Sequence, residues 1–361
     1  MNRQRNRQRR NRVDSGVLPI VLLSILLFAI LVATALVLVQ RSGHQPELPG
    51  TSYETAETEP PRESGDTDAD SESRQTENTS QETVSQETDA PPLFVYDFPS
   101  DIYSRYAILI DAQDGTVYAE KGADTRAFPA SVTKIMTVLV ALENISDPDA
   151  KTEISQELLN RLAEKNAAVA GFRAGESVTA RDMVYAALLP SGADGSVGLA
   201  ELVSGSEERF AVLMNQKAQE LGMTQTHFVN ATGLHHDEHY STCRDLAILL
   251  QNALENRDFR TAFTTQTYLT EGGIYMESTT FRGMRAAGLA STYIRGGKTG
   301  YTPEAGVCLA TLAEIGGREY ILVTLGAGNG SKYPQYNVMD AVRIWDDFAA
   351  CLSGADSGKA A

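Results

Sequence analysis

A serine and a lysine one helical turn apart stand out in the segment SVTKIMTVLVALE, residues 131 to 143. The apolar spacing predicts a helix, and on a helix Ser131 and Lys134 lie on one face. A serine hydroxyl needs a base to take its proton, and a lysine whose pKa is lowered by burial or nearby positive charge can be that base. A helix start also offers backbone N–H groups that stabilise an acyl oxyanion. Alone, S-x-x-K is a common pattern, and Ser131 would then be an ordinary helix cap.

Two further segments carry the same kind of chemistry. In LLPSGADGS, Ser191 lies in a glycine-rich loop after an apolar helix. In GGKTGYT, residues 296 to 302, Lys298 and Thr299 lie at the end of a predicted strand, where flanking glycines let a ligand approach the backbone. Taken alone, each segment also has an interpretation without catalysis. Ser191 would be an ordinary loop serine, and GGKTGYT would be a glycine-rich turn. Together, S-x-x-K, a loop serine and K-T-G occur in the order that marks penicillin-recognising serine enzymes.

Longer segments around these motifs resemble the serine-type D-alanyl-D-alanine carboxypeptidases, the low-molecular-mass penicillin-binding proteins. The resemblance runs from about Ile102 to about Leu325 and rests on YAILIDAQDGTVYAEKGADTRAFPASVTKIMTVLVALE, RAGESVTARDMVYAALLPSGADGS, THFVNATGLHHDEHYSTCRDLAIL and GGKTGYTPEAGVCLATLA. It implies an enzyme that removes the terminal D-alanine from peptidoglycan pentapeptides ending in D-Ala-D-Ala, through an acyl-enzyme. It also implies that β-lactam antibiotics are covalent inhibitors and that the reaction needs no cofactor.

The resemblance also implies three catalytic roles. Ser131 would be the nucleophile and Lys134 its general base. Ser191 would relay a proton to the departing amine. The backbone N–H groups of Ser131 and Tyr301 would form the oxyanion hole.

The substrate-binding residues implied by the resemblance lie on the K-T-G strand. Lys298 would orient Ser191 and, with Thr299, would hold the terminal carboxylate of the substrate. Gly300 and Tyr301 would complete the binding strand.

One position departs from the family pattern. The second motif should be S-x-N, and its third residue here is Ala193, which cannot hydrogen-bond the substrate amide. The neighbouring Asp194 is a possible partial substitute. Loss of one such polar contact costs about 1–3 kcal/mol, or roughly ten- to a hundred-fold in rate. We therefore expect a lower efficiency but the same chemistry.

The elements that position these residues follow from hydropathy patterns. YAILID and TVYAEKG, separated by Asp114-Gly115, predict a hairpin, and strands return from about Tyr293 with a turn at Gly316-Gly317. Residues 145 to 260 and the C-terminal segment are helical in period. We expect an α+β fold, with an antiparallel sheet of about five strands covered by the first and last helices and a helical subdomain to one side. The resemblance implies that this is the fold of DD-peptidases and β-lactamases.

Composition divides the chain into five parts. Residues 1–16 form a basic cytoplasmic tail, and 17–39, an uncharged apolar run, is long enough for a transmembrane signal-anchor helix. Residues 40–96 read as an acidic disordered linker, 97–353 as the catalytic domain and 354–361 as a flexible tail. This predicts a single-pass membrane protein with an extracytoplasmic domain. Ala33-Thr34-Ala35 leaves a cleaved signal peptide as the alternative.

Charge and cysteine content limit the other functions. The net charge of the 361 residues is −16, and the acidic body carries no basic stripe, which argues against nucleic acid binding. Three cysteines (Cys243, Cys308 and Cys351) cannot form a disulfide framework; we expect small buried residues, with one possible pair.

Three other functions are compatible with parts of the sequence. HHDEH, residues 235 to 239, matches the zinc pattern H-x-x-E-H, but those ligands need a helix, and Ser241 or Thr242 looks like the cap of the next one. We therefore expect the histidines in a loop, with one packed against the domain. A β-lactamase of the same fold needs an extra deacylating base; Glu164 and Glu176 lie in the right general region, but no sequence feature marks either as such a base. A catalytically weak penicillin- or peptidoglycan-binding sensor has Ala193 as its sole support.

Overall fold

The computed structural model describes residues 96–328 and 335–357. The predicted cytoplasmic tail, the anchor at 17–39 and all but the last residue of the linker at 40–96 lie outside these ranges. Within the described part of the chain, no helix is long and apolar enough to cross a membrane. Tyr96, assigned to the linker, is instead buried, and its hydroxyl donates to the Asp347 carboxylate at 3.1 Å. The folded domain therefore begins by Tyr96.

A five-stranded antiparallel sheet forms the centre of the domain, in the order β2-β1-β9-β8-β7. This confirms the predicted size and direction of the sheet. The N-terminal hairpin turns at Asp114-Gly115, where Gly115 has φ +75°. The strands are β1 (Tyr106–Asp111), β2 (Val117–Lys121), β7 (Ile294–Thr302), β8 (Gly306–Ile315) and β9 (Arg318–Ala327).

Alternate residues of the strands face two separate cores, as the two-residue period of a strand requires. Ile108 and Ile110 of β1 pack into one core, and Leu109 packs into the other. Helix α10 (Tyr336–Ser357) covers the second core with the fully buried Trp345 and Phe348. Because α10 continues to Ser357, the predicted tail at 354–361 begins inside a helix.

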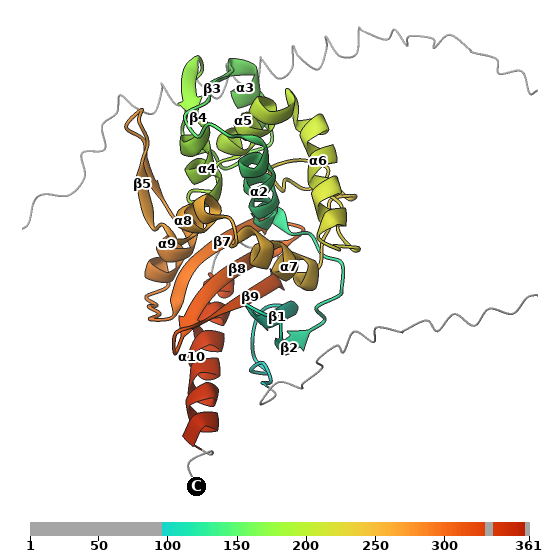
Figure 1. Ribbon diagram of the computed structural model, residues 1–361, viewed down its shortest axis with the longest axis vertical. Coiled ribbons are helices and arrows are strands. Elements are labelled where there is room, and N and C mark those ends of the chain that lie inside the picture. Colours follow the sequence, from blue (N-terminus) through green and yellow to red (C-terminus); the bar gives the residue numbers. More distant parts are fainter. Residues whose placement is uncertain (1–95, 329–334, 358–361) are drawn as a thin grey trace, which may run out of the picture. The chain divides into compact units, whose positions relative to one another are not determined.

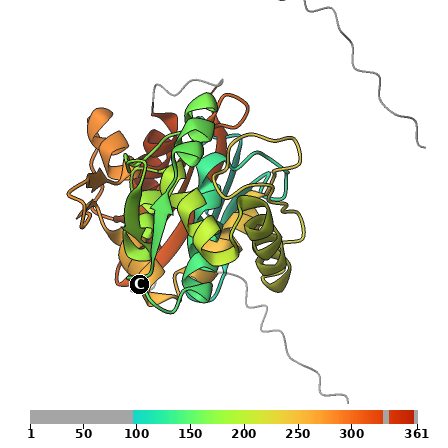
Figure 2. The same ribbon diagram turned by 90° about the horizontal axis from the view of Figure 1, so that it is seen from above.

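Helices α7 (Cys243–Ala253) and α8 (Arg257–Thr264) lie against the opposite face of the sheet. The prediction that the first helix would cover this face is wrong in detail. That helix, α2 (Lys134–Asn144), is the centre of the helical part, where it contacts α4, α5, α6 and α7 (Figures 1 and 2). Its residues from 135 to 141 are all buried, so it packs on every side.

The remaining elements build the helical part and two small two-stranded sheets. Each small sheet is an antiparallel pair of strands that the sequence did not predict: β3 pairs with β4 across the intervening helix α3, and β5 pairs with β6 as a hairpin. The elements are β3 (Lys151–Ile154), α3 (Gln156–Glu164), β4 (Glu176–Thr179), α4 (Ala180–Leu188), α5 (Ala193–Ser204), α6 (Glu207–Glu220), β5 (Thr267–Leu269), β6 (Tyr275–Glu277) and α9 (Thr279–Ala286).

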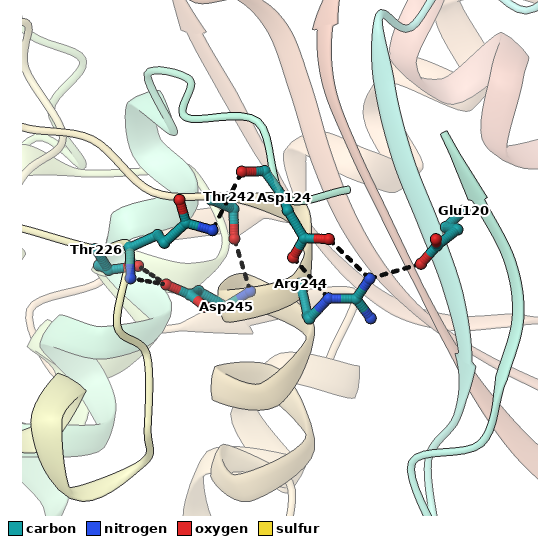
Figure 3. Close-up of polar contacts among 7 residues, drawn as sticks. Glu120, Asp124, Thr226, Thr242, Arg244 and Asp245 are labelled. Carbon is teal, nitrogen blue, oxygen red and sulfur yellow. Dashed lines mark hydrogen bonds and ion pairs between the residues drawn. The ribbon is translucent and has the colours of Figure 1, made fainter. Parts of the chain in front are cut away.

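A cluster of charged side chains ties the start of α7 to the N-terminal hairpin (Figure 3). The Arg244 guanidinium donates to both carboxylate oxygens of Asp124, at 2.7 and 3.0 Å, and to Glu120 at 2.6 Å. Next to it, the Asp245 carboxylate accepts from the Thr226 hydroxyl at 2.7 Å. These contacts fix both ends of the long segment between α6 and α7, which contributes to the candidate site.

Candidate active site

Ser131 lies in a short 3-10 turn, η1 (Ala130–Thr133), that leads directly into α2. The predicted helix therefore starts one turn later, at Lys134, and residues 131 to 133 form the tighter turn. Ala130 has φ +46°, a left-handed conformation that costs a non-glycine residue about 1–2 kcal/mol. Such strain persists only where surrounding contacts enforce it, and it is found most often at functional sites.

Lys134 points back to Ser131. Its Nζ donates to Ser131 Oγ at 2.9 Å and to the Thr232 carbonyl oxygen at 2.7 Å. Burial lowers the pKa of Lys134 to about 7, because the interior disfavours the ammonium ion, while the carboxylates of Asp194 and Glu207 oppose part of this shift. A large fraction of this lysine is therefore a neutral amine at neutral pH, beside a serine hydroxyl.

The Thr232 carbonyl is held in place by a loop, residues 230 to 234, that sequence reasoning did not single out. The Asn230 side-chain oxygen accepts from the backbone N–H groups of Thr232 and Gly233, at 3.1 and 2.7 Å, and its amide donates to the Leu234 carbonyl at 2.9 Å. Local bonds of this kind are typical of asparagine in turns. The loop at 230–234 therefore holds in place the carbonyl oxygen that Lys134 contacts.

Ser191 and Lys298 form a second pair. Lys298 Nζ donates to Ser191 Oγ and to the Thr299 carbonyl oxygen, both at 2.8 Å. Lys298 is 0% exposed, and burial together with the positive charge of Lys134 lowers its pKa well below the usual value. Ser191 itself has φ +66°, a second strained backbone next to the cleft. The Thr299 hydroxyl shares a 2.6 Å hydrogen bond with Thr279 of α9.

Strand β7 passes close to the serine turn at Gly300. A Cβ atom there would lie 2.9 Å from the Pro129 carbonyl oxygen and 3.0 Å from the Ser131 nitrogen. Only a glycine leaves room for this approach. The edge strand and the nucleophile turn therefore form two sides of one space.

These groups surround a cleft of ≈ 400 Å³. Six of the seven predicted site residues line it, and Lys298 lies behind Ser191. The lining also includes Arg282 of α9, an exposed guanidinium that no motif marked. The six predicted residues in the lining are Ser131, Lys134, Ser191, Thr299, Gly300 and Tyr301.

Ala193 lines the cleft as expected, but Asp194 does not replace the missing asparagine. The Asp194 side chain is fully buried and accepts from the backbone N–H groups of Ala170 and Gly171, at 2.8 and 3.0 Å. It stabilises the segment that follows α3. The polar contact expected from an asparagine at position 193 is therefore not supplied by its neighbour.

The HHDEH segment lies in a loop, as the sequence predicted. His239 is the packed histidine: it is buried, and its Nε2 lies 2.8 Å from the Thr133 hydroxyl. Thr242 caps α7 by accepting from the Asp245 N–H at 3.0 Å. Among the described residues, no group of His, Cys, Asp and Glu side chains is arranged to hold a metal ion. The loop therefore supports the serine site by packing under Thr133.

The remaining candidates lie away from the cleft. Glu164 ends α3 and Glu176 begins β4, and neither is part of the lining, so no candidate deacylating base faces Ser131 from those positions. Cys243 and Cys308 are buried free thiols, as predicted for small core residues. Cys351 is exposed on α10, and its predicted burial is wrong.

Comparisons with known proteins agree with this geometry. The sequence profile of a D-alanyl-D-alanine carboxypeptidase family matches residues 89–329. A D-alanyl-D-alanine carboxypeptidase of Bacillus subtilis (strain 168) is 37% identical over 232 residues, which cover 62% of this chain and 57% of the relative. One from Streptomyces sp. (strain K15) is 34% identical over 226 residues, covering 59% of this chain and 77% of the relative.

A solved structure has the same fold. The crystal structure of the Streptomyces K15 DD-transpeptidase matches with a TM-score of 0.61 and 31% identity, covering 69% of this chain and 97% of that protein. The chain thus spans nearly all of this structure, but only 57% of the length of the Bacillus relative.

Proposed function

Since the chain belongs to the D-alanyl-D-alanine carboxypeptidase family, we propose that it removes the terminal D-alanine from peptidoglycan stem peptides ending in D-Ala-D-Ala. The observation that carries this proposal is the 2.9 Å contact between Ser131 Oγ and a buried lysine whose pKa is about 7. A neutral amine at that distance can take the hydroxyl proton and make the serine a nucleophile.

The acylation step follows from the arrangement. Lys134 accepts the proton from Ser131 as Oγ attacks the carbonyl carbon of the penultimate D-alanine. The backbone N–H groups of Ser131 and Tyr301 stabilise the oxyanion. As the peptide bond breaks, Ser191 passes a proton to the leaving amine, helped by its 2.8 Å contact with Lys298. Water then hydrolyses the Ser131 ester and releases the shortened peptide.

The substrate carboxylate is proposed to lie between Thr299 and Arg282. Lys298 is fully buried, and its Nζ donates to Ser191 Oγ and to the Thr299 carbonyl oxygen, so its part is to orient Ser191. Arg282 is the exposed cation of the same cleft, and a guanidinium matches the geometry of a carboxylate. A neighbouring terminal carboxylate distinguishes the peptide bond that a carboxypeptidase cleaves from an internal peptide bond.

The purified domain should release D-alanine from a peptide ending in D-Ala-D-Ala and should form a benzylpenicillin adduct on Ser131. The matched substrate is the same peptide with a C-terminal amide, for which kcat/KM should fall about tenfold or more because the carboxylate contact is lost. An enzymatic D-alanine assay measures the release from the two peptides, and mass spectrometry detects the adduct on Ser131. Rapid hydrolysis of penicillin would indicate a β-lactamase, and an adduct without D-alanine release would indicate a sensor.

The rate of acylation should increase as the pH rises through about 7. Because burial holds the pKa of Lys134 at about 7, the lysine is protonated below this pH and cannot accept a proton; above it the neutral base predominates. The rate of benzylpenicillin adduct formation between about pH 5 and about pH 9 measures this. A rate that decreases with pH would contradict the assignment of Lys134 as the base.

We also propose that residues 17–39 anchor the protein in the cell membrane, with the catalytic domain on the extracytoplasmic side. The support is the uncharged 23-residue apolar run and the arginines that precede it. The acidic segment that follows would act as a tether. A mature N-terminus near Leu36 would replace the anchor with a cleaved signal peptide.

A further inference from the structure

The catalytic cleft contains a side-chain amide that no motif marked. Asn166 follows the end of α3 and contributes to the lining of the cleft, together with Ala167 and Ala168. Its backbone N–H is paired, but its side chain forms no hydrogen bond with any residue that the structure describes. The amide is therefore available to a molecule that binds in the cleft.

The end of α3 makes glycine the expected residue at position 166. Asn166 has φ +48°, its N–H donates to the Ala163 carbonyl at 3.0 Å, and the next N–H, of Ala167, donates to the Leu162 carbonyl at 3.0 Å. This pair of bonds closes a helix through one left-handed residue, which is most often glycine. Glycine adopts that conformation without steric cost, whereas a residue with a Cβ atom is strained there. The helix end alone thus favours glycine, and asparagine adds a polar group that the fold does not need.

The segment that carries Asn166 lies beside Ala193. The Ala193 N–H donates at 2.7 Å to the carbonyl oxygen of Ala168, two residues after Asn166. Further along the segment, the buried Asp194 carboxylate accepts from the Ala170 N–H at 2.8 Å. The backbone of the segment is therefore fixed at both ends, and it brings the Asn166 amide into the cleft next to the position where the family pattern has an asparagine.

We propose that Asn166 makes the substrate contact that Ala193 cannot make. This inference rests on the proposed carboxypeptidase function. The side-chain N–H of Asn166 donates to the carbonyl oxygen of the amide group on the N-terminal side of the D-alanine that Ser131 attacks. The contact holds the acyl part of the substrate during the attack and takes no part in proton transfer. The polar group missing from α5 is thereby supplied from the end of α3.

Asn166→Gly removes the amide and keeps the left-handed backbone. The kcat/KM for a peptide ending in D-Ala-D-Ala should fall about three- to tenfold, because one polar contact is lost. The unfolding temperature should stay the same or rise, because glycine fits this φ better than asparagine. An unchanged kcat/KM would overturn the assignment.

Two penicillins distinguish a substrate contact from a general disturbance of the site. Benzylpenicillin carries an amide group next to its β-lactam ring, and the bare penicillin nucleus has a free amine in its place. Asn166→Gly should slow the acylation of Ser131 by benzylpenicillin about three- to tenfold and leave acylation by the nucleus unchanged. Mass spectrometry of the adducts over time measures both rates. Equal slowing of the two would overturn the proposed contact.

Ala193→Asn tests whether one amide replaces the other. In the Asn166→Gly background it should restore the kcat/KM of the wild-type domain, whereas in the wild-type background it should change it less than about twofold, since the substrate amide is already held. An equal gain in both backgrounds would overturn the inference. The control is Val169→Ala, an exposed residue of the same segment outside the cleft lining, which should leave all rates unchanged. No D-alanine release by the wild-type domain would overturn the proposed function itself.

Discussion

Ser131→Ala is expected to release no measurable D-alanine and to form no benzylpenicillin adduct, while unfolding at the same temperature as the wild-type domain. The change removes the attacking oxygen, and losses of a serine nucleophile reach about 10⁴-fold or more. The fold should be unaffected, because Lys134 Nζ keeps its 2.7 Å contact with the Thr232 carbonyl when the hydroxyl is absent. D-alanine assay, mass spectrometry and thermal unfolding measure the three quantities.

Ser204→Ala is the matched control. Ser204 is also half-buried, and its hydroxyl donates to the Ala200 carbonyl at 3.0 Å, but it lies outside the cleft. This variant should retain both activities. Undiminished D-alanine release by Ser131→Ala, or an adduct on another residue, would return Ser131 to the role of a simple turn residue.

Gly233→Ala should reduce activity about a hundredfold and destabilise the domain by about 2–4 kcal/mol. Gly233 has φ +74°, and a Cβ atom there would lie 1.9 Å from the Ala130 carbonyl oxygen, a distance that no real contact reaches. Either the serine turn or the loop at 230–234 must move. Each movement shifts Lys134 relative to Ser131, because the loop carries the carbonyl that holds the lysine. Kinetics on the D-Ala-D-Ala peptide and chemical denaturation measure the two effects.

Gly222→Ala is the control that separates the effect of the close Cβ contact at position 233 from the effect of the positive φ. Gly222 has nearly the same φ, +73°, but an added Cβ would meet no atom within 4 Å. This variant carries only the conformational penalty of about 1–2 kcal/mol and should keep full activity. If the two variants behaved alike, the close approach at Ala130 would not matter, and the proposed coupling between loop and turn would be wrong.

The sequence predicted the sheet and the residues of the cleft because those signals are local. Strand alternation, glycine turns and the three-residue spacing of Ser131 and Lys134 can each be recognised within one short segment. The position of the serine in a 3-10 turn could not be predicted, since it depends on the strained Ala130 and its contact with Gly233. The support from Asn230 was missed for the same reason: it acts on a lysine far away in the sequence.

Other differences also come from tertiary contacts. Helix α2 is apolar all round, which is equally consistent with a helix on a sheet and a helix inside a bundle. Asp194 follows Ala193 in the sequence and was therefore a candidate for the cleft. In the structure its carboxylate is buried and accepts from the backbone N–H groups that follow α3. The strands of the two small sheets are three or four residues long and largely polar, so their alternation is too short to recognise.

The strand order has a consequence for synthesis. Strand β1 is an interior strand of the sheet, between β2 and β9, and Tyr106 pairs with Leu325. A nascent chain therefore carries an unpaired hairpin until nearly the whole domain has left the ribosome. Non-local pairings of this kind are slow to form, because the closing loop loses much entropy first. We expect chains that end before β9 to remain unfolded and to be degraded, although they already contain Ser131, Lys134, Ser191 and Lys298.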